Sequence, residues 1–342
     1  MTKPVHIALD AMSGDHGPSV IVPAALRAIT THPSLELTLV GDEPTLTRLL
    51  AERGAQTDPR IKLRHATQVV LMDELPSAAL RGKKDSSMRV AIDLVKEGEV
   101  DACISAGNTG ALMATARFVL KTLPGIDRPA ILAELPAIGG TTLMLDLGAN
   151  ADCSADHLFQ FAVMGAVVAS AIHGQPNPRV GLLNIGAEEM KGDEVIREAG
   201  QRLQASNLNY IGFVEGNDIF SDRVDVIVSD GFSGNVALKT AEGLGKMVSQ
   251  FLREEFTRSI LSKIAALAVL PALKRFRDRV DPRNHNGASL VGLRGIVIKS
   301  HGGADEHAFG HAIRIAVLEC EKAVPKRIEA LLDEQLKEVP QQ

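Results

Sequence analysis

Short apolar runs alternate with helical patterns along most of this chain, and a glycine-containing polar turn usually separates the two. Runs such as LLNI and VIVS are apolar throughout, as strands covered on both faces should be. This alternation predicts an α/β fold of three layers, α/β/α, around a largely parallel sheet. We expect strands at 5–10, 36–41, 61–65, 102–106, 130–134, 142–146, 180–185, 210–215, 224–230 and 295–300. We expect helices at 19–31, 43–53, 86–97, 109–121, 155–173, 192–205, 234–278, 305–322 and 325–337.

The 342 residues contain no internal repeat and no low-complexity segment. Length alone favours about two domains, at roughly 150 residues each. The best linker candidate, QPNP at 175–178, is too short to establish a boundary. We therefore expect a single α/β domain over 1–342 with an appendage at 248–283.

The appendage begins with apolar residues spaced three or four apart, which predict one helical stripe. They are Leu252, Phe256, Ile260, Ile264 and Leu267. The stripe runs into the apolar segment 265–270, which Pro271 should end, and a second, basic helix should follow. Between residues 253 and 279, seven basic and three acidic residues leave +4 within a chain of net charge −5. We therefore predict a protruding helical hairpin whose apolar tip is flanked by basic residues.

Two compatible interpretations of this hairpin are favoured about equally. An apolar tip beside basic residues fits a membrane surface or a docked partner. The residues expected to contact a membrane are Ala266, Leu267, Val269 and Leu270. Alternatively, two copies of the chain pair their hairpins and bury the apolar tips between them. The basic helix would also attract an acidic partner.

Composition excludes several classes of function. Aromatic residues make up 3% of the chain and none is Trp, which argues against an aromatic belt at a membrane and against stacking of single-stranded bases. The net charge of −5 offers no basic excess for nucleic acid. The longest apolar stretches, 161–172 and 264–273, are shorter than the ~20 residues of a membrane span. From the N-terminal residues MTKPVHIALD we expect no signal peptide.

The three cysteines also indicate an intracellular protein. Cys103, Cys153 and Cys320 are odd in number and far apart, and no C-x-x-C occurs. This usage predicts neither a disulfide framework nor a zinc site.

Ligands of open α/β sheets bind outside the carboxyl ends of the strands, so the residues after each strand matter most. Seven expected exits combine glycine with Asp, Asn, Ser or Lys, and together they predict one binding rim. They are 10–17, 105–110, 146–150, 184–192, 215–217, 229–235 and 300–305. Three exits lead directly into helices, where glycine and the helix N-terminus favour an anion. We therefore expect a phosphate or carboxylate ligand.

The substrate site should draw on acidic, amide, hydroxyl, histidine and glycine residues of these exits, although each also suits turn geometry. The candidates are Asp10, Asp15, His16, Gly107, Asn108, Thr109, Gly110, Asp146, Asn150, Asp230, Gly231, Ser233, Gly234 and His301. Gly302 and Gly303 would shape the same cradle. Neither G-x-x-x-x-G-K-[ST] nor G-x-G-x-x-G follows a strand, which disfavours the usual nucleotides. Asp10 and Asp15 could hold a metal or simply a turn, and we expect neither a metal nor a cofactor.

Two polar residues of the rim suit catalysis. Lys191 would supply a positive charge for a phosphate, and Asn235 would donate to a polarised carbonyl oxygen. Both suit a displacement in which phosphate is the nucleophile and the protein positions the reactants. The alternatives are a solvated loop charge for Lys191 and a helix N-cap for Asn235.

Seven blocks, in this order, closely resemble the bacterial phosphate acyltransferases of phospholipid synthesis, the PlsX type, over nearly the whole chain. The blocks are ALDAMSGDHGP (8–18), CISAGNTGALM (103–113), GIDRPA (125–130), LDLGAN (145–150), VGLLNIGAEEMKGDE (180–194), VSDGFSGNVALKTAEG (228–243) and GASLVGLRGIVIKSHG (287–302). The family pattern usually reads DAMGGD at the first turn, where this chain has Ser13 in place of glycine.

The resemblance implies an enzyme that converts acyl-[acyl-carrier-protein] and inorganic phosphate into acyl phosphate and free carrier protein. A membrane-bound glycerol-3-phosphate acyltransferase would then consume the acyl phosphate. The implied fold is similar to isocitrate and isopropylmalate dehydrogenases and to phosphotransacetylases. The implied protein is a cytoplasmic homodimer, peripherally associated with the inner face of the cell membrane through the hairpin. The catalytic Lys and Asn of the family map onto Lys191 and Asn235.

Two other functions are kept open. The shared fold allows an NAD-dependent β-decarboxylating dehydrogenase, for which Asp127 and Arg128 are the only hint. The hairpin alone would suit a membrane-recruited interaction protein without catalysis of its own.

Overall fold

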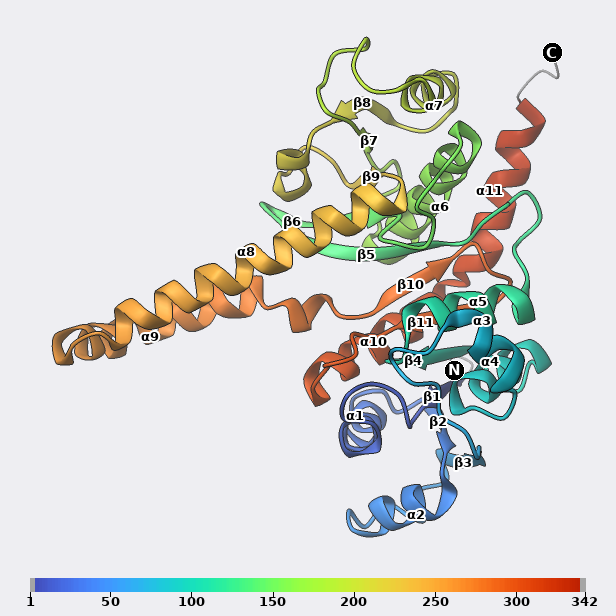
Figure 1. Cartoon of the computed structure of the whole chain (residues 1–342), viewed down its shortest axis with the longest axis vertical. Helices are drawn as coiled ribbons and strands as arrows, with labels where there is room; N and C mark the ends of the chain where they lie inside the picture. The colour runs from blue at the N-terminus through green and yellow to red at the C-terminus, as the bar shows by residue number, and fades with distance from the viewer. Residues whose placement is uncertain (1–3, 339–342) are drawn as a thin grey trace.

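A computed structural model describes residues 4–338 and places all strands in one sheet, with helices on both faces (Figure 1). The strands are β1 Val5–Asp10, β2 Leu35–Gly41, β3 Ile61–His65, β4 Ala102–Ser105, β5 Ala130–Ala137, β6 Gly140–Leu145, β7 Val180–Leu183, β8 Tyr210–Val214, β9 Val226–Val228, β10 Ala288–Val291 and β11 Ile296–Lys299. The helices are α1 Pro18–Thr31, α2 Glu43–Ala51, α3 Pro76–Gly82, α4 Ser87–Glu97, α5 Thr109–Leu120, α6 Ala155–His173, α7 Glu194–Gln204, α8 Gly231–Thr257, α9 Ile260–Val280, α10 Glu306–Lys322 and α11 Val324–Glu338. Two short 3-10 helices, Gly216–Phe220 and Pro282–His285, complete the described elements.

The sheet consists of two parallel halves joined by antiparallel pairings in the middle. The strand order is β3-β2-β1-β4-β11-β10-β5-β6-β9-β7-β8. The first five strands are mutually parallel, and so are the last four. The three antiparallel pairings, β11 with β10, β10 with β5 and β5 with β6, lie between them. The predicted largely parallel α/β sheet is therefore confirmed, with an antiparallel centre that the alternation did not reveal.

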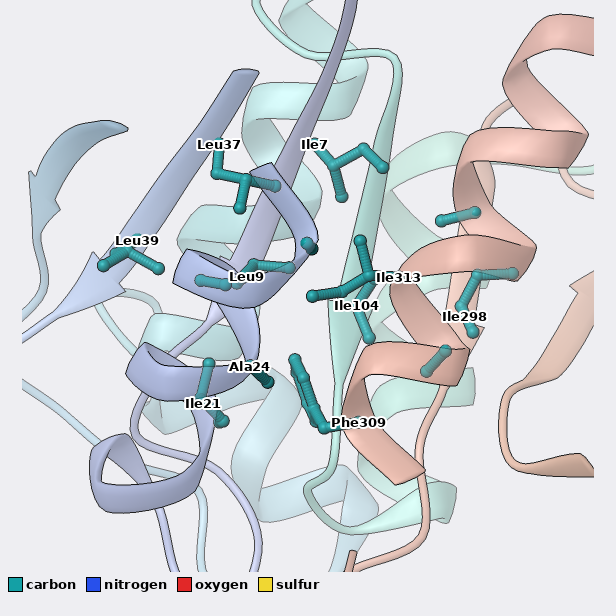
Figure 2. Packing of buried hydrophobic residues seen from close by; sticks show 14 of the residues in the cluster. Ile7, Leu9, Ile21, Ala24, Leu37, Leu39, Ile104, Ile298, Phe309 and Ile313 are labelled. Carbon is teal, nitrogen blue, oxygen red and sulfur yellow. The ribbon is translucent and has the colours of Figure 1, made fainter. Parts of the chain in front are cut away.

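The core of the first half packs the sheet against α1 and α10 (Figure 2). Ile7 and Leu9 of β1 and Leu37 of β2 point toward these helices, where Phe309 and Ile313 of α10 meet them. The opposite face is covered by α4 and α5. In the second half, α6 lies against the sheet together with α11 and α7.

Two short elements were absent from the expected series. The strand β10 is four residues long, and the helix α3 is seven residues long. Both are too short to show a clear hydrophobic period, which explains why the pattern did not separate them from loops. Strand β10 matters for the fold because it carries two of the antiparallel pairings.

The hairpin is present, but its turn is not where the sequence placed it. Helices α8 and α9 extend side by side away from the sheet (Figure 1) and are joined at Arg258 and Ser259. The Ser259 hydroxyl caps α9 by accepting a 3.0 Å hydrogen bond from the Ser262 N–H. Pro271 lies inside α9 instead of ending it, as Pro23 does inside α1. The expectation that Pro271 stops the helix is wrong, because the following residues are good helix formers and only one internal donor is lost.

This shift moves the predicted membrane contacts from the tip to the middle of α9. Leu267, Val269 and Leu270 are exposed there, and Ala266 is half-buried. The residues nearest the turn, Ile260 and Leu261, are 78% and 79% exposed.

Helix α6 is long and apolar enough to cross a membrane by length and composition alone. It includes the apolar stretch 161–172, which by itself is shorter than a membrane span. Two-thirds of its apolar window is buried inside the protein (67%), where α6 packs on the sheet. This burial is that of a core helix.

Candidate active site

The loops that follow β1, β4 and β11 meet in one tight junction. The Asp15 N–H donates to the Gly302 carbonyl at 2.9 Å. The Ala106 N–H donates to the Ser13 hydroxyl at 2.9 Å, and that hydroxyl donates to the Asp10 carbonyl at 2.8 Å. Gly14 has φ 79°, and a Cβ there would lie 2.8 Å from the carbonyl oxygen of Gly302. Glycine is therefore required where these loops touch.

Asp10 lies at the floor of this junction. Its side chain is 1% exposed, and Oδ2 accepts a 2.6 Å hydrogen bond from the Ser105 hydroxyl. Burial raises the pKa of Asp10, and the Ser105 hydrogen bond opposes that rise. The other oxygen, Oδ1, has no hydrogen-bond partner within the described part of the chain. Asp10 thus lies in the floor of the junction and out of contact with solvent.

Asp15 and His16, which follow on the same loop, are both exposed. Among residues 4–338, no three His, Cys, Asp or Glu side chains come together in a way that could hold a metal ion. Asp10 and Asp15 are therefore not part of a metal cluster within that range.

The start of α5 leaves an exposed helix N-terminus beside this junction. Thr109 and Gly110 open the helix and are exposed, whereas Gly107 is buried. Asn108 caps α5 by accepting from the Ala111 N–H at 3.0 Å. The Asn108 amide nitrogen donates to the carbonyls of Met72 and Glu74. Both ends of its side chain are used within the protein, so Asn108 holds the loop instead of being free for a ligand.

His301 is an exposed residue of the β11 exit. Its Nδ1 accepts from the Gly303 N–H at 3.1 Å, which assigns the proton to Nε2 and leaves that N–H available as a donor. Its backbone N–H donates to Asn286 at 2.9 Å. His301 and the start of α5 are the surface groups of this junction that suit an anion.

The second group of predicted residues follows β6 and β9, and many of these residues hydrogen-bond to one another or to the neighbouring backbone. The Asp146 carboxylate is fully buried and accepts from the backbone N–H groups of Ile131, Gly148, Ala149 and Asn150. The Asn150 amide donates to Asp146 at 2.9 Å and to the Pro129 carbonyl at 2.9 Å. Asp146 and Asn150 therefore shape the loop that follows β6, and the Asp146 carboxylate and the Asn150 amide nitrogen are both engaged within the protein.

Helix α8 begins in contact with that loop. A Cβ on Gly234 would lie 1.9 Å from the Asp146 carbonyl oxygen, and one on Gly231 would lie 2.6 Å from the Asn150 carbonyl oxygen. Asp230 is the N-cap, accepting from the Ser233 N–H at 2.7 Å and from the Ser233 hydroxyl at 2.8 Å. Gly231 and Gly234 thus allow a close approach, while Asp230 and Ser233 start the helix.

Asn235 lies in the second turn of α8 and is exposed. The N-cap alternative for Asn235 is wrong, because Asp230 fills that position. Gly148, with φ 128°, lies against it, since a Cβ there would be 3.6 Å from Asn235 Oδ1. The Asn235 amide makes no hydrogen bond to any other described residue and faces outward over the β6 exit.

Lys191 lies on the loop between β7 and α7. Its backbone N–H donates to the Glu188 carbonyl at 3.0 Å, and its carbonyl accepts from the Asn184 amide at 3.1 Å. The side chain is exposed and forms no ion pair within residues 4–338. Ile185 and Met190 on the same loop are also strongly exposed.

The expected single rim is incorrect in its simple form, because the two halves of the sheet run in opposite directions. A flat sheet would put their exits on opposite edges. Sheet twist, on average about 20–25° per strand, reduces this separation. The charge of Lys239 on α8 accordingly lowers the pKa of Lys299 at the end of β11.

Lys299 is a residue that the sequence interpretation missed. It ends a strand whose other residues, Ile296, Val297 and Ile298, are all apolar and buried. Polar residues commonly end strands, so the sequence gave no reason to single out this lysine. The available signal was its place between a buried strand and the glycine-rich turn SHGG.

Solved structures define the class to which this fold belongs. A phosphotransacetylase from Streptococcus pyogenes matches with a TM-score of 0.65, covering 93% of this chain and 94% of its own, at 18% identity. A second phosphotransacetylase, from Staphylococcus aureus, gives 0.59 over 93% and 94%, at 16% identity. The fold is therefore that of the phosphotransacetylases.

Sequence comparison then identifies the family. A model described as "Fatty acid synthesis protein" matches residues 5–327. Phosphate acyltransferases from Methylococcus capsulatus and Nitrosococcus oceani are each 60% identical to this chain, covering 94% and 98% of it and 95% and 98% of their own lengths. The one from Halorhodospira halophila is 58% identical, with 97% of both covered. The chain belongs to this phosphate acyltransferase family.

The predicted resemblance is thus confirmed, and the chain is a transferase whose reaction class is acyl transfer to phosphate. The dehydrogenase and non-catalytic interpretations are set aside. The two residues that motivated the dehydrogenase interpretation hydrogen-bond to nearby parts of the protein. Asp127 accepts from Gln160, and Arg128 donates to the Asp152 carbonyl.

Proposed function

We propose that this enzyme moves a fatty acyl group from acyl-[acyl-carrier-protein] to inorganic phosphate. The observation that carries the proposal is the junction of the β1, β4 and β11 exits with the exposed start of α5, combined with membership of the family. The exposed residues Thr109 and Gly110 at the N-terminus of α5 and the exposed His301 suit a phosphate. No cofactor is needed for this reaction.

In the proposed reaction, a phosphate oxygen attacks the thioester carbonyl carbon and forms the new C–O bond. The C–S bond then breaks, and its electron pair leaves with the pantetheine thiolate of the carrier protein. Asn235 would donate to the carbonyl oxygen as negative charge develops there, and Lys191 would neutralise and orient phosphate. A thiolate leaves readily without a strong acid, because the pKa of a thiol is only about 8.5.

A fatty acyl group requires apolar surface near these polar groups. Leu71, Met72 and Leu75, between β3 and α3, are exposed, and the Met72 side chain lies against Gly302. Ile185 and Met190 supply exposed apolar area beside Lys191. Burial of such area by an alkyl chain is worth about 25 cal/mol per Å², which supports a long acyl chain as the transferred group.

The proposed partners follow from the same reaction and from the arm formed by α8 and α9. The product would pass to a membrane-bound glycerol-3-phosphate acyltransferase for phosphatidic acid synthesis. We propose a cytoplasmic homodimer that contacts the membrane peripherally through the arm, supported by the exposed apolar residues on both arm helices. The acidic carrier protein would be attracted by the basic residues of α9, which include the exposed Lys274, Arg275 and Arg279.

The test is an acyl-phosphate assay on Lys191→Ala and Asn235→Ala. We expect each to lower kcat/KM by about 100-fold or more, the usual effect of losing one donor to a developing oxyanion or one phosphate cation. Lys96→Ala, which removes an exposed lysine at the far end of α4, should leave kcat/KM unchanged. Near-wild-type turnover in both folded variants would refute their catalytic roles.

A further inference from the structure

Lys299 is a buried lysine at the end of β11. Its side chain is 9% exposed. In the sheet register Lys299 pairs with Ser105 of β4. Side chains alternate along a strand, so Lys299 shares a face with Val297, which packs on the α4 and α5 side. Ser105 and Asp10 lie on that same face, and they form a polar floor at the ends of three neighbouring strands.

The Lys299 ammonium has fewer partners than a buried charge requires. It donates to the Ser300 carbonyl and, at 3.4 Å, to the Ala106 carbonyl. A lysine has three N–H donors, and no third acceptor occurs within residues 4–338. No carboxylate in that range lies within 4 Å of it either. Burial of a charge without an ion pair is unfavourable unless a counter-charge is supplied, so an anion beside Lys299 would be stabilised.

The ammonium lies at the edge of the sheet, where two strand exits begin. Its two acceptors, Ala106 and Ser300, are the first residues of the β4 and β11 exits. Its charge interacts with Asp15 on the β1 exit and with Lys239 on the third turn of α8. Groups of both sheet halves therefore act on Lys299, and α8 also carries Asn235 one turn earlier.

We propose that Lys299 is a substrate-binding residue whose ammonium holds a tetrahedral phosphate dianion, either inorganic phosphate or the phosphoryl group of the acyl phosphate product. This assignment rests on the proposed function, and it adds a buried cation to the exposed Lys191. The dianion would lie against the start of α5 and the β11 exit, where helix N–H groups complete its coordination. Lys299 orients the nucleophile and supplies charge without forming a bond.

Titration of Lys299 gives the site a pH signature. Burial lowers the pKa of Lys299 to about 8, the charge of Lys239 acts in the same direction, and Asp10 and Asp15 oppose both. The ammonium is thus mainly charged at pH 7 and loses its proton as the pH rises from 8. Phosphate is already a dianion in that range because its second pKa is near or below 7. Phosphate affinity should therefore fall about tenfold per pH unit above pH 8.

The direct test is calorimetric titration of inorganic phosphate into wild type, Lys299→Met, Lys299→Arg and the distant control Lys96→Met. We expect Lys299→Met to weaken phosphate binding at pH 7 by at least tenfold and Lys96→Met to leave it unchanged. Lys299→Arg should restore part of the affinity and make it independent of pH between 8 and 9.5, because guanidinium stays charged. A folded Lys299→Met that binds phosphate within twofold of wild type would overturn the proposal.

If Lys299→Met does not fold, the wild-type enzyme still decides the question. A phosphate affinity that is constant between pH 8 and 9.5 in wild type would contradict a Lys299 site. An acyl-phosphate assay of wild type separates this inference from the proposed function. Acyl phosphate formation together with a flat phosphate profile refutes Lys299 alone, whereas absence of acyl phosphate with phosphate binding that depends on Lys299 refutes the acyl-transfer proposal and retains the anion site.

Discussion

At the scale of single residues, several polar groups that suit a ligand are committed to the protein itself. Asp146 and Asn150 hydrogen-bond each other and the loop around them, and Asn108 binds two carbonyls while capping α5. Residue type and position after a strand predict that these side chains are important. They cannot separate a ligand contact from a loop contact, because the hydrogen-bonding chemistry is the same in both.

Ser13 is a polar residue whose role can be measured. It stands where the family pattern usually has glycine, and its buried hydroxyl joins the β1 exit to Ala106. Ser13→Ala should lower the free energy of unfolding by about 1–3 kcal/mol, because the Ala106 N–H is left buried without its acceptor. Ser19→Ala, which removes an exposed hydroxyl that donates to the His16 carbonyl, should change it by less than about 0.5 kcal/mol. Urea unfolding followed by circular dichroism measures both, and equal effects would show that the junction does not depend on Ser13.

At the scale of elements, the start of α8 decides how the second half of the site is built. Its first turn touches the loop after β6, so glycine at two positions is a steric requirement. The remainder of α8 leaves the sheet and becomes half of the arm. One helix thus contributes both a catalytic candidate, Asn235, and the surface proposed for membrane or dimer contact.

Two glycines of this helix provide a matched pair. Gly234→Ala would place a Cβ 1.9 Å from the Asp146 carbonyl oxygen, whereas at Gly243 a Cβ meets nothing within 4 Å. We expect Gly234→Ala to destabilise the protein by more than about 2 kcal/mol and to abolish most acyl phosphate formation. Gly243→Ala should be neutral or stabilising by up to about 1 kcal/mol. Thermal unfolding with an activity assay tests the pair, and a Gly234→Ala enzyme of normal Tm and kcat would contradict the close approach.

A comparison of predicted and observed elements shows which features the sequence predicts and why other features could not be predicted. Strand β3 and helix α6 match their predicted ranges, because β3 alternates between apolar and polar residues, while α6 is a long apolar run bounded by the Ser154 cap and Gly174. The prediction that Pro271 ends a helix failed because the tendency of proline to break helices is local. The position of the turn is set instead by the Ser259 cap and by the packing of α9 along α8. Lys299 was not predicted as a site residue because its polar surroundings include Asp10 and Ser105. Only the pairing of the strands brings these two residues beside it.

At the scale of the whole molecule, the candidate site and the arm lie on different parts of the enzyme. The candidate active site lies among the strand exits, while the arm formed by α8 and α9 extends away from the sheet (Figure 1) and carries exposed apolar side chains. Phe251 of α8 and Leu261 and Leu267 of α9 are all more than half exposed. Exposed apolar side chains on both helices support the proposed contacts of the arm with a second copy or with a membrane.

The last prediction separates docking from chemistry. Leu267→Glu and Leu261→Glu should each reduce sedimentation with phosphatidylglycerol-containing vesicles by about tenfold or more, since burial of one leucine is worth about 1.5–3 kcal/mol. Thr257→Glu adds the same charge to an exposed site of the arm without removing apolar area and should reduce it far less. Turnover of a water-soluble acyl donor should be unchanged in all three. Ultracentrifugation of the same variants tests whether these residues also stabilise the proposed dimer, and unchanged vesicle binding in both leucine variants would refute the arm as the membrane contact.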